Sequence, residues 1–344
     1  MAPPFQLIAI SLFLSTSLIA QTKSLPQGIY YYEGLSSSGS HNDPNTWTCW
    51  VSPTKDHIHG VLGRETWEEY EPSEGVYNDA IFFGIIASRA ASTRLQYEIQ
   101  ITINGAGNYP QWVVTAGAKT TNVHSNSGAV VTVINPGDPV FQAKLKAMLT
   151  HLGSIYDRDI NCRVIQMTGP GRSGECVFCS QNPTYISDWT WLQNQGGGTV
   201  DGGEDLWELW ATTIAGYYAA AFPTTHFEYA TGGPVPNTID PNNDTMHNVV
   251  IQLVGSYNLA GVRFGTSSHG FSLNAPTADY GTGMQSYQQT RAVGAPAAGN
   301  EAVKLLGNDN SGRPYNANWF EVAHKDCDLP GNWPGMDQFN QQAP

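Results

Sequence analysis

The hydrophobic residues of the chain recur in two patterns, one typical of strands and one typical of helices. The clearest strand is Leu95 to Asn104, LQYEIQITIN, in which β-branched residues recur at every second position before a Gly-Ala-Gly stop. The clearest helix runs from Pro139 to Ile155 behind a capping Asp138. Its apolar residues recur at three- and four-residue spacing: Val140, Leu145, Met148, Leu149 and Leu152.

Similar patterns cover most of the chain. Further strands are predicted at residues 28–33, 60–64, 162–167, 226–229 and 262–265, and a seventh that brings Glu301 to its end. Further helices are predicted at residues 78–91, 204–221, 241–256 and 278–293, with a small hairpin inside 115–133. Strand and helix alternate throughout, which is the pattern of a parallel α/β barrel.

The end of the chain departs from this alternation. Only 43 residues follow Glu301, and they contain one helix-like segment, Asn318 to His324, before a tail rich in proline and glycine. We therefore expect a (β/α)8 TIM barrel over residues 25–325 whose eighth β/α unit is irregular or missing. Residues 326–344 are expected to form an irregular tail.

Composition narrows the class of ligand. The chain of 344 residues has a formal net charge of −13 and only 13% charged residues, so we expect no nucleic-acid partner. Ten tryptophans and many amide side chains suit a neutral, hydroxyl-rich ligand, because aromatic faces stack on sugar rings and amides bind hydroxyls. Most of the tryptophans can equally serve the core.

The N-terminus indicates export. Residues 1–20 contain no charged side chain and an apolar run from Leu7 to Leu14, which is typical of a secretory signal peptide. We expect a secreted, extracellular glycoprotein, with Asn243 in an Asn-Asp-Thr sequon. No later apolar run is long enough for a membrane span, so no membrane association is expected.

The five cysteines leave their pairing open. Secretion makes disulfides plausible, but an odd number means that at least one thiol is free or pairs between chains. Cys176 and Cys179 could form a redox or zinc half-site, or a disulfide that braces their loop. We favour the disulfide, since no second such pair and no nearby histidine accompanies them.

A carboxylate follows the predicted fourth strand. The apolar run Val164 to Met167 ends abruptly in glycines and a proline, and Glu175 closes this segment. The loops after strand carboxyl ends hold the chemistry of α/β barrels, and Asn104 ends a strand at the same rim. A solvated glutamate on a surface loop is the alternative interpretation.

Five motifs together resemble the retaining (β/α)8-barrel glycoside hydrolases of clan GH-A. They are Arg64-x-x-Trp67, Glu71-Pro72-x-x-Gly75-x-Tyr77, Pro110-x-Trp112, Gly169-Pro170 to Gly174-Glu175, and Glu301. The resemblance implies that Glu175 is the acid/base after strand four and Glu301 the nucleophile after strand seven. It also implies that Arg64 orients the nucleophile, while Asn104, Trp112, Tyr229 and His269 are candidate substrate-binding residues.

The implied chemistry needs two carboxyl groups roughly 5–5.5 Å apart, one protonated and one ionised. Glu175 would protonate the leaving oxygen and later activate water, and Glu301 would attack the anomeric carbon of a β-linked oligo- or polysaccharide. No cofactor is expected. His57 and His59 alternate as metal ligands can, but no clear third ligand accompanies them, so no metal site is expected either.

Two alternatives stay open at this point. A catalytically silent barrel that binds glycans, as a lectin or effector, is favoured by Gly174, which stands where many clan members have asparagine before the acid/base. A barrel hydrolase acting on esters or amides is disfavoured, because the chain lacks a Gly-x-Ser-x-Gly elbow. We expect a monomer in every case. For the glycosidase and for the glycan-binding barrel we also expect a carbohydrate partner.

Overall fold

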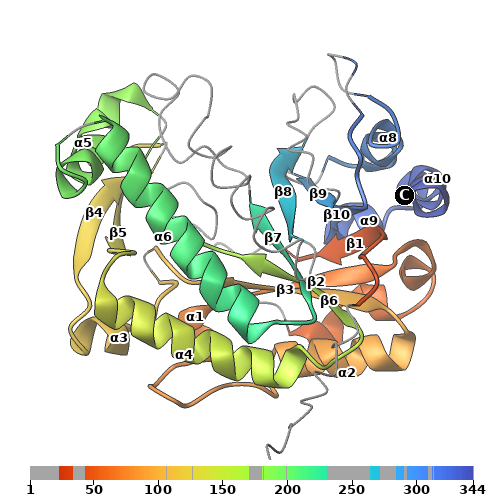
Figure 1. Cartoon of the computed structure of the whole chain (residues 1–344). Helices are drawn as coiled ribbons and strands as arrows, with labels where there is room; N and C mark the ends of the chain where they lie inside the picture. The colour runs from red at the N-terminus through yellow and green to blue at the C-terminus, as the bar shows by residue number, and fades with distance from the viewer. Residues whose placement is uncertain are drawn as a thin grey trace, which may run out of the picture.

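Eight parallel strands close into a barrel in the computed structural model (Figure 1). The structure describes residues 23–33, 43–105, 107–125, 127–169, 180, 182–198, 200–230, 264–271, 284–289, 293–308, 312 and 314–343. In barrel order from the first strand, the strands are β1 (Gly28–Tyr32), β2 (Gly60–Thr66), β3 (Gln96–Thr102), β6 (Cys162–Met167), β7 (His226–Ala230), β8 (Phe264–Phe271), β9 (Gln285–Gln289) and β10 (Trp319–Ala323). The predicted α/β barrel is confirmed.

The last two strands differ from the sequence prediction. Strand β9 lies inside the segment 278–293 that was expected to be helical, and β10 lies inside the expected helix 318–324. Strand β10 pairs with both β9 and β1, so the eighth strand is present and closes the barrel. Glu301 belongs to helix α8 (Ala297–Lys304) and does not end a strand.

Helices surround the barrel on its outer side. They are α1 (Trp67–Tyr70), α2 (Phe83–Thr93), α3 (Gln111–Thr115), α4 (Pro139–Tyr156), α5 (Ile186–Gln195), α6 (Val200–Ala221), α8, α9 (His324–Cys327) and α10 (Trp333–Gln342). Helices α4 and α6 pack together on one flank, where the predicted hairpin, β4 (Thr120–His124) and β5 (Val130–Ile134), lies beside α5 (Figure 1). Helices α8 and α10 pack together on the opposite flank (Figure 1). The expected helix 241–256 lies outside the described residues.

The C-terminal residues form helix α10 where an irregular tail was expected. Pro334 lies in its first turn, where a missing N–H costs nothing, so the proline does not break the helix. The Asn340 amide ties α10 to the barrel, since it donates to the His57 carbonyl at 2.9 Å and accepts from the Ile29 N–H at 2.8 Å. His57 contacts Asp337 at 2.8 Å, which gives it a structural partner.

The two faces of the barrel wall differ in composition because side chains alternate along each strand. Outward residues pack with the helices in one large apolar core that includes Ile99, Ile101, Phe227, Tyr287 and Phe320. Inward residues form a small apolar plug at the amino end of the barrel: Tyr30, Val164, Met284 and Trp319. Above this plug the interior is polar, which explains why β9, QSYQQ, carried no hydrophobic pattern.

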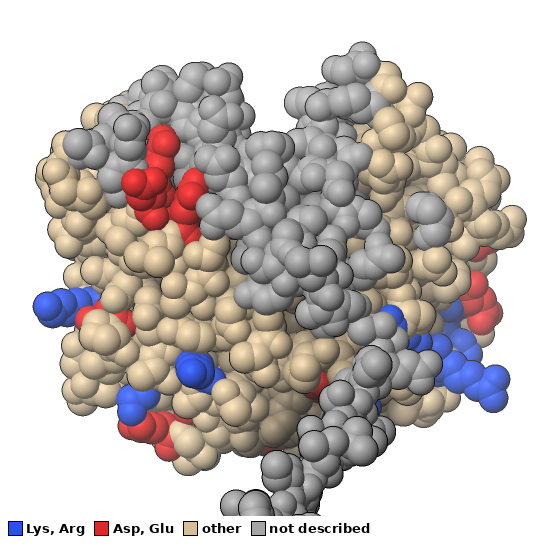
Figure 2. Space-filling view, in the orientation of Figure 1, with Lys and Arg blue, Asp and Glu red and all other residues tan. Residues whose placement is uncertain are grey.

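Three further expectations concern the whole chain. Cys49, Cys162 and Cys327 are buried free thiols, whereas Cys176 and Cys179 lie outside the described residues, as do the signal peptide and Asn243. Within the described part of the chain, no helix combines the length and the apolar character that crossing a membrane requires. Uncharged residues form most of the described surface in Figure 2, in keeping with the low charged content.

Candidate active site

A row of polar side chains crosses four neighbouring strands inside the barrel. Arg64 of β2 is in register with Gln100 of β3, Gln100 with Gln166 of β6, and Gln166 with Glu228 of β7. Arg64 Nε donates to Gln100 Oε1, Gln100 Nε2 donates to Gln166 Oε1, and Gln166 Nε2 donates to Glu228 Oε1 at 2.6 Å. Each amide therefore accepts from one neighbour and donates to the next.

The same network continues on the other side of the barrel. Arg64 Nη2 donates to Gln288 Oε1 of β9 at 3.3 Å, and Gln288 Nε2 donates to Glu321 Oε2 of β10. Ser286 Oγ, also on β9, donates to Glu228 Oε2 at 2.8 Å. The network thus links strands from both halves of the chain, and it can form only when the barrel is closed.

Three glutamates lie together in the barrel interior, in contact with the arginine and glutamine network. Oxygens of Glu98, Glu228 and Glu321 lie within 4.8 Å of one another, and all three residues are fully buried. Burial and the neighbouring carboxyl groups raise the pKa of Glu98 well above its ordinary value. A cluster with this spacing can share protons or ligate a cation. Trp319 Nε1, Ser286 and Gln288 each donate to one oxygen of the cluster, and a side-chain hydrogen bond joins Glu98 to Glu228, which favours shared protons.

The carboxyl end of this interior presents a guanidinium and amides. Arg64 is half-buried, and Gln288 and Tyr32 retain 7% exposure, whereas the three glutamates are completely covered. A fixed guanidinium with amides on either side offers several donors and acceptors at one level of the barrel. Such a surface can bind hydroxyl groups through donors and acceptors alike, which apolar groups cannot use.

The expected acid/base follows the end of strand four. Strand β6 is the fourth barrel strand and ends at Met167, as predicted, and Thr168 and Gly169 continue from its carboxyl end. Glu175 lies outside the described residues, six positions after Gly169. Its place in the site therefore stays a prediction.

Glu301 lies on the outer side of strand seven. Hydrogen bonding to Gln289 lowers its pKa, but burial raises the pKa more, to about 7. Gln288 bonds inside the barrel, so the next residue, Gln289, points to the helix layer, where its Nε2 donates to Asp326 at 2.7 Å. The expected position of Glu301 at a strand end was wrong, because strand seven ends at Gln289 and no acidic residue occurs between Gln285 and Asn300.

Arg64 and the four candidate substrate-binding residues have different surroundings. Arg64 lies at the carboxyl end of the barrel interior, as described above. Asn104 is fully buried and binds the hairpin, since its Oδ1 accepts from Ile134 N at 2.8 Å and its Nδ2 donates to Ile134 O at 3.0 Å. Trp112 Nε1 donates to the Glu71 carbonyl at 2.9 Å, and its ring packs edge-on against Trp67. Asn104 and Trp112 thus anchor loops.

The other two candidates lie on the fifth and sixth strands. Tyr229 is fully buried in the core formed with the helices, because it alternates with the inward-facing Glu228. It therefore faces away from the barrel interior, contrary to the expectation. His269 belongs to β8 in register with Gln288, and its side chain lies outside the described part of the structure.

Sequence reasoning missed most of the interior residues. Gln100, Gln166, Glu228, Gln288 and Glu321 were not among the candidates. One signal was available: the polar residues of QYEIQIT occupy every second position of β3, opposite its isoleucines. Read as the inward face of a barrel strand, that alternation predicts a polar interior. In β9 and β10 no comparable signal exists.

Comparisons with known proteins support the fold. No protein-family model and no curated protein sequence matches the chain. Among solved structures, it is similar to the catalytic domain of a β-amylase from Paenibacillus polymyxa, with a TM-score of 0.58 and 10% identity over 93% of this chain and 100% of that one. It is also similar to a cold-adapted β-galactosidase from Rahnella sp. R3, with a TM-score of 0.51 and 10% identity over 94% of this chain and 57% of that one. At this identity the likeness shows the fold, and the resemblance to glycoside hydrolase barrels is confirmed at that level.

Proposed function

We propose that this protein is a secreted glycoside hydrolase that binds a β-linked oligo- or polysaccharide at the carboxyl end of its barrel. The observation that carries the proposal is the polar interior there, where Arg64 lies between Gln100 and Gln288. Active sites of (β/α)8 enzymes lie at this end. The similar solved structures, a β-amylase and a β-galactosidase, support carbohydrate as the substrate class.

Glu175 is the proposed acid/base. Glycoside hydrolysis needs one protonated carboxyl for the leaving oxygen and a second carboxylate that attacks the sugar or activates water. The loop after strand four starts at the carboxyl end of β6, so the chain leads to Glu175 from the correct end of the barrel. In the retaining form of the proposal, Glu301 is the nucleophile. The assignment of Glu301 has less structural support than that of Glu175, because Glu301 contacts the outer side of β9.

A glycan-binding barrel without hydrolysis is the second candidate. The observation that favours it is the end of strand seven, where Gln288 and Gln289 stand in place of a carboxylate. A site with binding groups but without the second carboxylate would hold a sugar and leave its glycosidic bond intact. Binding and hydrolysis therefore have to be measured on the same ligands.

The deciding experiment is hydrolysis of a panel of aryl glycosides by the wild type and by Glu175→Gln. Loss of a general acid lowers the rate by about 10²- to 10⁴-fold, and we expect a decrease of that size. Glu301→Gln is the matched comparison: an equal decrease supports the retaining pair, and retention of most activity excludes Glu301 as nucleophile. The anomeric configuration of the first product, followed by NMR, separates retention from inversion.

One outcome would contradict the hydrolase proposal, and another would contradict the assignment of its acid/base. If the wild type binds oligosaccharides by calorimetry but hydrolyses none of the panel, the glycan-binding candidate replaces the hydrolase. If Glu175→Gln keeps full activity, the hydrolase proposal survives but the acid/base lies elsewhere. N-terminal sequencing of the exported protein tests secretion, with cleavage expected after Ala20.

A further inference from the structure

The outer face of strand β2 carries a glutamate in an otherwise apolar row. Val61, Gly63 and Glu65 point outward, because they alternate with the inward Arg64. Helix α2 packs closely here, since a Cβ at Gly63 would lie 2.6 Å from Cδ1 of Ile86. Glu65 is only 4% exposed. A residue that breaks its local pattern in this way is expected at functional or strained positions.

The carboxyl group of Glu65 has no compensating partner in the described structure. Its Oε2 is buried without a hydrogen-bond donor. The neighbouring Glu69 is also an acid and already accepts from Thr66 Oγ1 at 2.9 Å. The hydroxyls of the neighbouring Tyr70 and Tyr156 donate elsewhere, to the Asp79 carboxylate and carbonyl. A buried carboxyl left in this state costs free energy that a ligand can recover.

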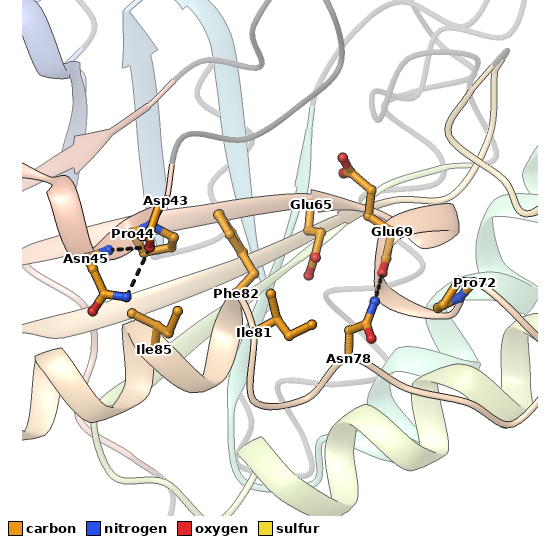
Figure 3. Close-up of a pocket in the computed structure, with 10 residues that line it drawn as sticks. All are labelled: Asp43, Pro44, Asn45, Glu65, Glu69, Pro72, Asn78, Ile81, Phe82 and Ile85. Atoms are coloured by element: carbon orange, nitrogen blue, oxygen red, sulfur yellow. Dashed lines mark hydrogen bonds between the residues drawn. The ribbon is translucent and has the colours of Figure 1, made fainter.

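A pocket of about 600 Å³ opens beside this carboxyl, between β2, α2 and the short helix η1 (Pro44–Thr46) (Figure 3). Figure 3 shows the Glu65 carboxyl directed toward Ile81, between Phe82 and Asn78. Half of the described lining side chains are apolar: Pro44, Pro72, Ile81, Phe82 and Ile85. Ile81 is 60% exposed, so its side chain is accessible to a ligand in the pocket.

We propose that this pocket binds an organic ammonium ion, with the ammonium on Glu65 and the hydrocarbon body against Ile81 and Phe82. None of the described lining residues is Lys or Arg, while Asp43, Glu65 and Glu69 are acidic, so the pocket disfavours anions. An ammonium supplies both the missing charge and the missing donors. The apolar walls disfavour a sugar, and the volume lies in the usual range for small ligands.

This site is separate from the proposed carbohydrate site. Glu65 points to the helix layer, whereas the adjacent Arg64 points into the barrel, so the wall of β2 lies between them. The inference therefore goes beyond the proposed function, and loss of one activity leaves the other measurable.

Ammonium binding is coupled to proton release. Burial, with a smaller contribution from Glu69, raises the pKa of Glu65 to about 9, so the free pocket holds a neutral carboxyl at neutral pH. Binding of the ammonium ionises Glu65 and sends one proton to solvent. Affinity should then rise by about tenfold per pH unit up to about pH 9, provided that Glu69, Asp43, Tyr70 and Tyr156, which surround the site, keep their protonation states.

The test uses isothermal calorimetry of the purified protein with hexylamine, and with 1-hexanol and hexanoate as probes of equal length. We expect hexylamine to bind, and to bind at least about tenfold more tightly than hexanol at about pH 8. Glu65→Gln should weaken hexylamine binding by about tenfold or more while leaving hexanol unchanged. Asp43→Asn, at an exposed acidic position of the same pocket, is the matched control and should change affinity by about twofold or less.

A second variant keeps the proposal open to refutation if Glu65→Gln fails to fold. Ile81→Ser changes an exposed side chain and should weaken hexylamine and hexanol alike, since it removes only the apolar wall. The proposal is overturned if hexylamine gives no binding heat at millimolar concentration or binds no more tightly than hexanol. Affinity independent of pH would likewise overturn it, as would a folded Glu65→Gln protein with unchanged affinity.

Discussion

Carboxyl groups are buried on both faces of the barrel wall, but their surroundings differ. Inside, Glu98, Glu228 and Glu321 lie within 4.8 Å of one another and accept hydrogen bonds from the indole, hydroxyl and amide groups around them. Outside, Glu65 and Glu301 each have an Oε2 without a donor in the described structure, as the inner Glu98 has an Oε1. Burial raises carboxyl pKa values on both faces, whereas only the inner groups belong to a network.

This difference separates carboxyl groups that stabilise the barrel from carboxyl groups whose ionisation can change with pH or with a ligand. The inner groups are fixed by donors from several strands, so a change in one of them disturbs the closed barrel. Each outer group lies outside this network, with at most a local partner such as Gln289 beside Glu301, so its ionisation depends on pH or on a ligand. Substitutions on the inner face should therefore change the free energy of unfolding at every pH, and those on the outer face should change its pH dependence.

The largest expected effect is that of Arg64→Met. Arg64 donates to the side-chain carbonyls of Gln100 and Gln288, and methionine leaves both without this donor. Hydrogen bonds from a charged group contribute about 1.5–3 kcal/mol each, so we expect a loss of about 4 kcal/mol in urea unfolding. Arg64→Lys is the control and should lose less, since it keeps the charge but not the fork. A loss below about 1 kcal/mol for methionine would mean that the inner network does not stabilise the barrel.

A smaller, pH-dependent effect is expected for Glu301→Gln. The pKa of Glu301 is about 7 in the folded protein and near its ordinary 4.5 when unfolded, so the folded state holds the proton more tightly. This contribution is fully present below about pH 4.5, is lost as pH rises to about 7, and is constant above that. The unfolding free energy of the wild type relative to the glutamine variant should fall by about 3 kcal/mol over this window.

The measurement is urea unfolding of both proteins at several pH values. The difference between the two proteins isolates Glu301, because all other groups titrate in both. A difference that does not change with pH would show that Glu301 is ionised in the folded protein. Glu301 would then have a cationic partner beyond the described contacts, and its assignment as a nucleophile would gain support.

The sequence predicted the strands whose outward faces carry an apolar pattern. Strands β3 and β6 and helix α4 were found where expected because alternating or periodic apolar residues specify their buried faces. Strand β9 has a single apolar residue, Tyr287, since its inward residues bond the polar interior, and a pattern of that kind also suits a helix. Because residues 278–293 were predicted to be helical, the seventh strand was predicted further along the chain, with Glu301 at its end.

The site was predicted in part for the same reason. Arg64 was placed at the carboxyl end of strand two by a local motif, and the structure puts it there. Asn104 was correctly placed just beyond a strand, but its amide binds Ile134, some thirty residues later, and local pattern carries no information about such a partner. Gln288 and Glu321 lie on the two strands that were predicted wrongly, so the bonds of Gln288 to Arg64 and Glu321 could be seen only in the closed barrel.

The smallest expected effect distinguishes two members of the inner cluster. Glu98 accepts from Trp319 Nε1 at 3.2 Å, and its raised pKa keeps it neutral at neutral pH, so Glu98→Gln replaces one neutral group by another. We expect a change within about 1 kcal/mol. Glu228 accepts from both Gln166 and Ser286, and a glutamine there turns its NH₂ toward one of these donors, which should cost about 2 kcal/mol. Urea unfolding followed by tryptophan fluorescence measures both variants. If Glu98→Gln costs as much as Glu228→Gln, Glu98 is ionised in the fold, and the cluster holds its charge through a bound cation instead of through shared protons.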